Sequence, residues 1–194
     1  MGTKKISRIM VTGALGQIGS ELTVELRRRY GRERVIATDL KSLPQGTGMN
    51  DGPFEQADVT DAERMATLAR RHGIDTIVPL AAILSATGEK DPTRAWRVNM
   101  TGLINALELA RELELTQVLC PSSIAVFGDG CPKENTPQET VLRPGTMYGV
   151  TKVAGELLCD YYVRRFGVDA RGLRYPGIIS AETLPGGGTT DYAV

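Results

Sequence analysis

Residues 6–19 read ISRIMVTGALGQIG, and this stretch decides the fold. Its first part, residues 6–11, is apolar and rich in β-branched side chains, which predicts a buried strand. Its second part carries Gly13, Gly16 and Gly19 in a Gly-x-x-Gly-x-x-Gly pattern. Apolar residues at helical spacing follow, with three arginines and then a glycine at the end, which predicts a helix. The unit is a strand, a glycine turn and a helix.

This unit is typical of a dinucleotide-binding turn. Gly13 permits the tight turn, Gly16 lets the backbone approach a pyrophosphate, and Gly19 lets the helix pack on the strand. Asp39 stands 20 residues after Gly19, at the end of the second predicted strand, where a carboxylate can accept both ribose hydroxyls. The residues predicted to hold the cofactor at this turn are Gly13, Gly16, Gln17, Ile18 and Gly19. The alternative is a purely structural glycine turn.

Strands and helices alternate along the rest of the chain. Further strands are predicted at 35–37, just before residue 58, at 74–80, 118–121 and 168–173, and further helices at 62–72, 91–113 and 147–165. The long helix at 91–113 places Trp96, Met100, Leu103, Leu107 and Ala110 along one side, and the helix at 147–165 carries Val153, Leu157 and Tyr161. This alternation predicts an α/β fold, a doubly wound parallel sheet (Rossmann fold) with right-handed crossovers.

The composition excludes several classes of protein. The 194 residues carry 23 Lys and Arg against 23 Asp and Glu, so the chain lacks the basic field that nucleic-acid binding needs. Three cysteines without a Cys-x-x-Cys spacing predict neither a disulfide framework nor a metal site. No signal peptide or membrane-spanning run is evident, so we expect a protein that binds no membrane and is cytoplasmic, or lies in an organelle matrix after removal of a targeting segment.

The cofactor prediction extends to two further segments. An acid at Asp39 repels a 2′-phosphate, which favours NAD over NADP, whereas nearby Lys41 is the feature that would favour NADP. Asp58 and Val59 are candidates for contact with the adenine ring, with a helix entry as the alternative. The small residues of Leu80-Ala81-Ala82 suit a segment passing close to a cofactor, with a simple exit from a strand as the alternative.

Candidate catalytic groups follow the cofactor segments. Tyr148 and Lys152 are four residues apart in a predicted helix, so they share one face. An ammonium beside a phenol favours the phenolate and lowers a pKa that is ordinarily near 10, as proton abstraction requires. A serine from Ser122-Ser123, at the end of the preceding strand, could hold a substrate oxygen. The single histidine, His72, lies at a helix end, which argues against a Ser-His-Asp hydrolase.

These motifs together resemble the extended short-chain dehydrogenase/reductases, over essentially the whole chain. The segments that carry the resemblance are the glycine turn, Asp39, Leu80-Ala81-Ala82, Val98-Asn99, residues 122–128 and Tyr148-x-x-x-Lys152. The resemblance implies that Ser123, 25 residues before Tyr148, is the catalytic serine. It implies that Asn99 supports the active-site water and the lysine, and that Tyr175-Pro176 passes the nicotinamide.

Finer features resemble the short-chain type of L-threonine 3-dehydrogenase within the NAD-dependent epimerase/dehydratases. The segments are residues 81–89, 147–152 and the terminal run PGGGTTDYA at 185–193. This implies oxidation of L-threonine to 2-amino-3-ketobutyrate with NAD⁺. Gly187 and Thr189 would bind the amino acid, because consecutive glycines expose N–H groups to a carboxylate, and Ser85 is a second substrate contact with a helix entry as its rival.

The resemblance also sets expectations for organisation. Residues 1–175 would form the NAD-binding domain with its Ser/Tyr/Lys residues, and 176–194 would begin a small C-terminal substrate domain that is mostly absent. The helix with Tyr148 and Lys152 would pair across a homodimer interface. Two other functions remain open: a nucleotide-sugar epimerase or dehydratase, and a fragment that binds NAD without catalysis.

Overall fold

A computed structural model describes residues 5–46 and 48–178. The strands are β1 (Ile9–Thr12), β2 (Val35–Asp39), β3 (Phe54–Gln56), β4 (Thr76–Pro79), β5 (Gln117–Ser123) and β6 (Ala170–Tyr175). The α-helices are α1 (Gln17–Tyr30), α2 (Ala62–His72), α3 (Ser85–Gly88), α4 (Pro92–Glu112) and α5 (Met147–Phe166). Three short 3-10 helices are η1 (Arg32–Arg34), η2 (Gly48–Asp51) and η3 (Ile124–Val126).

All six strands run parallel in one sheet, in the order β3-β2-β1-β4-β5-β6. The predicted doubly wound parallel sheet is confirmed. The winding direction reverses between β1 and β4, and in such sheets the crevice outside the carboxyl ends of the strands at this point is where ligands bind. The glycine turn after β1 and the segment after β4 both start at this crevice.

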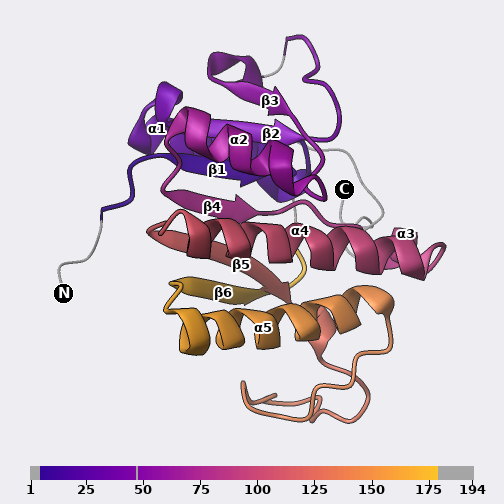
Figure 1. Cartoon of the computed structure of the whole chain (residues 1–194). Helices are drawn as coiled ribbons and strands as arrows, with labels where there is room; N and C mark the ends of the chain where they lie inside the picture. Colours follow the sequence, from indigo (N-terminus) through magenta and orange to yellow (C-terminus); the bar gives the residue numbers. More distant parts are fainter. Residues whose placement is uncertain (1–4, 47, 179–194) are drawn as a thin grey trace.

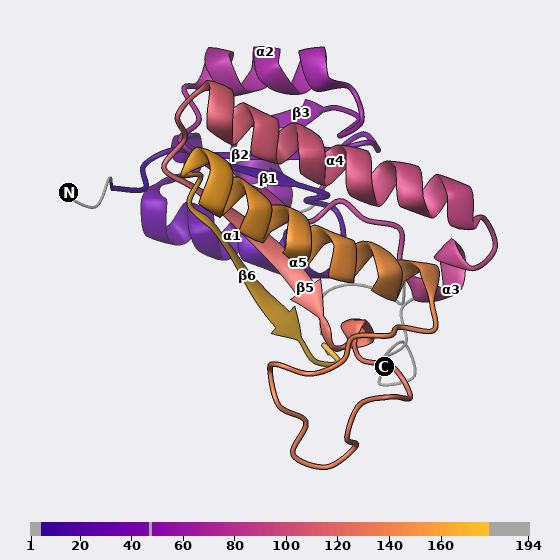
Figure 2. The same cartoon turned by 60° about the horizontal axis from the view of Figure 1, so that its bottom comes forward.

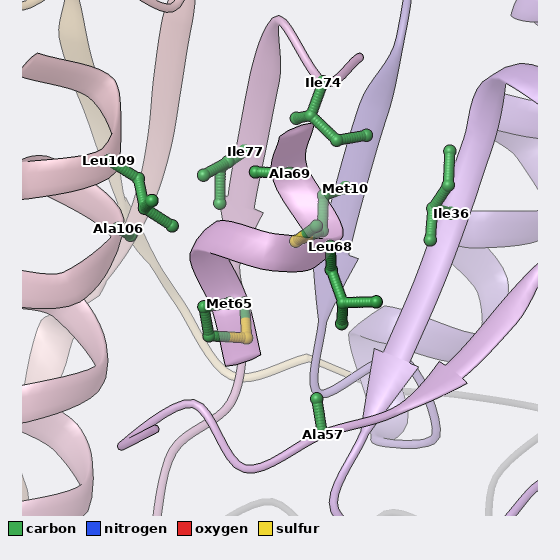
Figure 3. Close-up of a cluster of buried hydrophobic side chains, with 10 residues drawn as sticks. All are labelled: Met10, Ile36, Ala57, Met65, Leu68, Ala69, Ile74, Ile77, Ala106 and Leu109. Carbon is green, nitrogen blue, oxygen red and sulfur yellow. The ribbon is translucent and has the colours of Figure 1, made fainter. Parts of the chain in front are cut away.

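Helices cover both faces of the sheet. Figures 1 and 2 show α2, α4 and α5 side by side on one face and α1 on the other. Alternate residues of β1 belong to the two hydrophobic clusters on opposite faces of the sheet. Met10 packs toward α2 and α4, whereas Ile9 and Val11 pack toward α1. Figure 3 shows the first of these clusters, in which Met10, Ile36 and Ile77 of the sheet meet side chains of α2 and α4.

The first strand starts later than residue 6, where the sequence pattern places its beginning. The amide groups of Ser7 and Arg8 donate to the carboxylate of Asp75, at 2.9 Å each to Oδ2, instead of pairing with a neighbouring strand. The Asp75 carboxylate therefore takes the N–H groups that a longer strand would use, and β1 begins at Ile9.

Three large side chains on the predicted helix faces point outward. Trp96 is 44% exposed, Leu157 is 63% exposed and Tyr161 is 50% exposed. The buried side of α5 carries small residues instead, among them Gly155. A Cβ atom at Gly155 would lie 3.0 Å from Leu103 Cδ2 of α4, so the two helices approach too closely there for a large side chain. Among the described residues, no helix combines the length and hydrophobicity that a bilayer span requires.

Candidate active site

The glycine turn leaves no room for side chains. Gly13 has a φ of +66°, and a Cβ atom there would lie 2.6 Å from the Ala81 nitrogen. A Cβ atom at Gly19 would lie 2.3 Å from the Gly13 carbonyl oxygen. Both contacts are with backbone, which cannot rotate away. The turn therefore packs directly against the start of α1 and against the segment that leaves β4.

The start of α1 differs from the starts of the longer helices. Asp61, Asp91 and Thr146 each accept a backbone N–H at the beginning of α2, α4 and α5. The N-cap of α1 is Gly16, which has no side chain to accept one. Gln17 turns its side-chain amide to the Ile178 carbonyl oxygen, at 3.1 Å. The turn thus presents backbone donors near Gln17 and Ile18 in the arrangement that suits a pyrophosphate.

Asp39 stands beside this turn at the end of β2. Its Oδ2 accepts the Leu15 N–H at 3.0 Å, and its Oδ1 accepts the Lys41 N–H at 3.0 Å. Two backbone donors on opposite sides fix the carboxylate next to the glycine turn. The glycine turn and this carboxylate lie together, as the adenosine half of a dinucleotide requires. Contact of Asp39 with a ribose stays a prediction.

Asp58 and Val59 have visible roles within the chain. Asp58 Oδ1 accepts the Thr60 amide and the Thr60 hydroxyl, each at 2.8 Å, in the turn that leads to α2. The Val59 carbonyl accepts the Asn105 side-chain amide at 2.8 Å, and the Val59 side chain fills the space left by Gly102. Contact of either residue with an adenine ring stays a prediction.

The segment Leu80-Ala81-Ala82 runs along the same crevice. The Leu80 N–H donates to the Thr12 carbonyl oxygen at 3.1 Å, which ties the exit of β4 to the end of β1. Ala81 and Ala82 line a cavity of about 560 Å³ that also reaches Asn99 and Lys152. One cavity therefore joins the segment after β4 with Asn99 and Lys152.

Tyr148 and Lys152 lie on the face of α5 that looks toward the end of β5. Lys152 Nζ is 5.4 Å from the centre of the Tyr148 ring and donates to the Pro121 carbonyl oxygen at 2.7 Å. Burial lowers the pKa of Lys152 to about 8, although Cys120 and Cys159 act in the opposite direction. The hydrogen bond to the Pro121 carbonyl oxygen thus holds the Lys152 ammonium against the face of the Tyr148 ring.

The pKa of Tyr148 moves in the direction opposite to the sequence-based expectation. Burial raises it, and the hydrogen bond with Ser123 only partly offsets that effect. Burial is the larger cause, and the Lys152 ammonium, over the ring and bonded to the Pro121 carbonyl oxygen, does not figure among the causes of the shift. The shift therefore favours the neutral phenol of Tyr148.

The structure separates the two candidate serines. Ser123 contacts Tyr148 and lies opposite Tyr175 in the pairing of β5 with β6, so Tyr175-Pro176 passes the same place. Ser122 is buried on the side of α5 and donates to Glu156 Oε1 at 2.5 Å. Ser123 therefore lies with Tyr148, whereas Ser122 contacts the same helix two turns further on, at Glu156.

Asn99 joins three segments around the site. Its Oδ1 accepts the Ile83 N–H at 2.8 Å, and its Nδ2 donates to the Ile83 carbonyl and to Thr151 Oγ1, each at 3.1 Å. Thr151, which sequence reasoning missed, lies between Tyr148 and Lys152 and donates in turn to the Tyr148 carbonyl at 2.8 Å. Asn99 thus links the segment after β4, through Ile83, to α5, through Thr151.

The predicted substrate residues are only partly described. Ser85 is the first residue of α3, which agrees with a helix entry, and its contact with a substrate stays a prediction. Gly187 and Thr189 lie outside the described residues.

The six-stranded sheet, the glycine turn and Asp39 at the end of β2 are the features of a dinucleotide-binding α/β domain. The chain belongs to the NAD dependent epimerase/dehydratase family, whose model matches residues 9–191. The family resemblance found in the sequence is therefore confirmed.

Individual relatives cover this chain almost completely. A protein of Staphylococcus saprophyticus described as an uncharacterized epimerase/dehydratase is 57% identical over 189 residues, which are 97% of this chain and 59% of the relative. The chain thus spans about three fifths of the length of the curated relatives it matches.

Solved structures of threonine dehydrogenases are similar over the same part. The L-threonine dehydrogenase from Clostridium difficile superposes with a TM-score of 0.94 at 55% identity, covering 98% of this chain and 60% of that one. A monomeric L-threonine 3-dehydrogenase from a metagenome gives 0.90 at 50% identity, covering 95% and 58%. A UDP-glucose 4-epimerase from Thermotoga maritima gives 0.79 at only 26% identity, covering 87% and 55%.

Proposed function

We propose that this chain carries the NAD-binding and catalytic part of an L-threonine 3-dehydrogenase, which oxidises the 3-hydroxyl of L-threonine to give 2-amino-3-ketobutyrate. The observation that carries the proposal is the meeting of Ser123, Tyr148 and Lys152 at the crevice where the glycine turn and Asp39 also lie. The similarity to solved threonine dehydrogenases at 50–55% identity supports the choice of substrate.

Each residue has a role in this proposal. Ser123 orients the substrate hydroxyl, Tyr148 takes its proton as general base, and Lys152 supplies positive charge and holds the cofactor ribose. Asn99 keeps the segment after β4 and the first turn of α5 in place through Ile83 and Thr151. When bound, NAD⁺ would supply the hydride acceptor and a positive charge. Tyr148, whose pKa burial raises, would lose its proton more readily beside such a charge.

The proposal also covers the substrate end and the domain boundary. Ser85, Gly187 and Thr189 would bind the amino acid. The NAD-binding domain would end at residue 175, which is also the last residue of β6.

Threonine-dependent formation of NADH tests the function directly. We expect the protein to reduce NAD⁺ in the presence of L-threonine and to use NADP⁺ at least about tenfold less well, because Asp39 repels a 2′-phosphate. The measurement is the absorbance of the reduced cofactor in parallel assays. L-serine and UDP-glucose serve as comparison substrates.

Two outcomes would support other functions. Turnover of UDP-glucose without oxidation of threonine would favour a nucleotide-sugar epimerase, to which the similarity of the T. maritima enzyme points. NAD binding by calorimetry without turnover of any 3-hydroxy amino acid would favour a fragment that binds NAD without catalysis. This alternative is weighed because the chain spans about three fifths of the length of its relatives.

We further propose that the chain forms a homodimer through α4 and α5. These helices lie side by side (Figures 1 and 2). Both expose large apolar side chains. The exposed side chains include Trp96 and Ile104 on α4, and Leu157 and Tyr161 on α5. A second copy would cover such a surface.

Sedimentation tests the dimer. We expect the 194-residue chain to sediment as a dimer and the Leu157→Asp variant as a monomer, because a carboxylate cannot be buried there without a partner. Val24→Asp, at an exposed position on α1, is the matched control and should remain dimeric. A monomeric wild type, as in the metagenome relative, would refute the proposal.

A further inference from the structure

The face of α5 that carries the candidate catalytic residues continues for one more turn. Tyr148, Lys152 and Glu156 are spaced by four residues, so they lie in a row along the helix. Each contacts the end of β5: Tyr148 meets Ser123, Lys152 donates to Pro121 O, and Glu156 accepts from Ser122. Three successive contacts therefore set the position of α5 relative to the strand.

Glu156 also forms a two-point ion pair with Arg174 of β6. Arg174 Nε lies 2.8 Å from Glu156 Oε1, and Nη2 lies 2.7 Å from Oε2. Both side chains are largely buried. Burial alone would raise the pKa of Glu156, but the hydrogen bonds from Arg174 and Ser122 outweigh it and lower the pKa. The pair is charged and geometrically fixed.

The register of the sheet places this pair beside the catalytic serine. Arg174 lies opposite Ser122 in the pairing of β5 with β6, one position before Ser123 opposite Tyr175. Ser122 and Arg174 thus reach the same carboxylate from neighbouring strands. A shift of either strand end relative to α5 would break at least one of these bonds.

Arg174 holds the loop before α5 as well. Its Nη1 donates to the Gln138 carbonyl at 2.7 Å, and its guanidinium lies 5.1 Å from the centre of the Phe127 ring. Gln138 and Phe127 belong to the long connection between η3 and α5, which delivers Tyr148. A single arginine therefore fixes the strand end, the helix and the connection between them.

We propose that Glu156 and Arg174 are positioning residues, which set the distance between Ser123 and the Tyr148-Lys152 pair. This inference rests on the proposed function for its kinetic test. Neither residue belongs to the predicted catalytic set. Misplacement of reacting groups by about 1 Å can cost about a hundredfold in rate, so removal of the pair acts on the chemical step.

The kinetic test removes one partner of the ion pair at a time, Glu156 on α5 or Arg174 on β6. We expect Glu156→Gln and Arg174→Met each to lower kcat for threonine oxidation by about 10–100-fold, while the KM values for threonine and NAD⁺ change by less than about threefold. Asp169→Asn is the matched control. Asp169 lies just before β6, pairs with Arg171 at 2.7 Å on the exposed surface and accepts the Gln117 side-chain amide at 3.3 Å, at the end of the sheet away from Ser123. This variant should keep wild-type kcat.

A double variant separates positioning from a contribution to stability alone. Glu156→Leu with Arg174→Met removes both charges, and apolar replacements of a buried pair often restore stability. We expect this variant to unfold near the wild-type denaturant concentration and still to show low kcat. Wild-type kcat in the double variant, or in both single variants, would overturn the inference.

Failure of the wild type to oxidise threonine would refute only the proposed function. Amide hydrogen exchange would then test the positioning role. With NADH bound, we expect Glu156→Gln to speed amide exchange in residues 120–128 and 146–153, and Asp169→Asn to leave exchange in these segments unchanged. Unchanged exchange in Glu156→Gln would refute the positioning role in that case.

Discussion

Replacement of Tyr148 by phenylalanine should lower threonine-dependent NADH formation by about 10²–10⁴-fold, the range that a general base contributes. Phenylalanine keeps the ring beneath which Lys152 lies and removes only the phenol oxygen that Ser123 contacts. Binding of NADH, followed by its fluorescence, should remain within about threefold of wild type because the glycine turn and Asp39 are untouched.

Tyr161→Phe supplies the control for this experiment. Tyr161 lies on the same helix, but it is half exposed and contacts Tyr162 and Phe166 at the surface. Its variant should keep full activity. If Tyr148→Phe retains more than about a tenth of wild-type activity while its NADH binding is intact, Tyr148 is not the general base.

The parts of the fold that the sequence predicts are those set by local chemistry. The glycine turn and the helix caps at Asp61 and Asp91 each depend on a few neighbouring residues. Alternating strands and helices then leave few ways to close a sheet, so the parallel architecture follows. The start of β1 depends instead on Asp75, 67 residues beyond Arg8, and no local pattern carries that contact.

Helix faces were harder to predict for the same reason. The predicted inner side of α4 is confirmed at Met100, Leu107 and Ala110, although Trp96 is exposed. On α5 the prediction was wrong, because Leu157 and Tyr161 are exposed. The outcome is decided by Gly155, where α5 meets Leu103 of α4. Helical glycines near large apolar residues are the signal that could have indicated the close side.

In the candidate site, spacing brings together Tyr148 and Lys152 but says nothing of where the ammonium points. Lys152 donates to a carbonyl of β5, and this contact requires the packed sheet. Glu156, four residues after Lys152, could have been noticed from spacing alone. Its partner Arg174 could not, because the pairing of β5 with β6 brings it there.

The second large effect concerns Gly19, where a single methyl group should disrupt the cofactor turn. A Cβ atom at this position would lie 2.3 Å from the Gly13 oxygen and 2.7 Å from the Ala14 Cα, both in the backbone. Alanine in a helix ordinarily gains about 1 kcal/mol over glycine, whereas overpacking typically costs about 1–3 kcal/mol. Because neither backbone contact can rotate away, we expect the steric cost to win.

Gly19→Ala should therefore unfold at a lower urea concentration and bind NADH about a hundredfold more weakly, since a displaced α1 moves its first-turn N–H groups away from the pyrophosphate. Gly130→Ala is the control, because its Cβ atom would meet nothing within 4 Å and both measurements should stay at wild-type values. Loss of stability with unchanged NADH affinity would separate the packing of Gly19 from cofactor binding. The glycine pattern would then have only its structural meaning, and the site would have to bind its cofactor through Asp39 and the segment after β4.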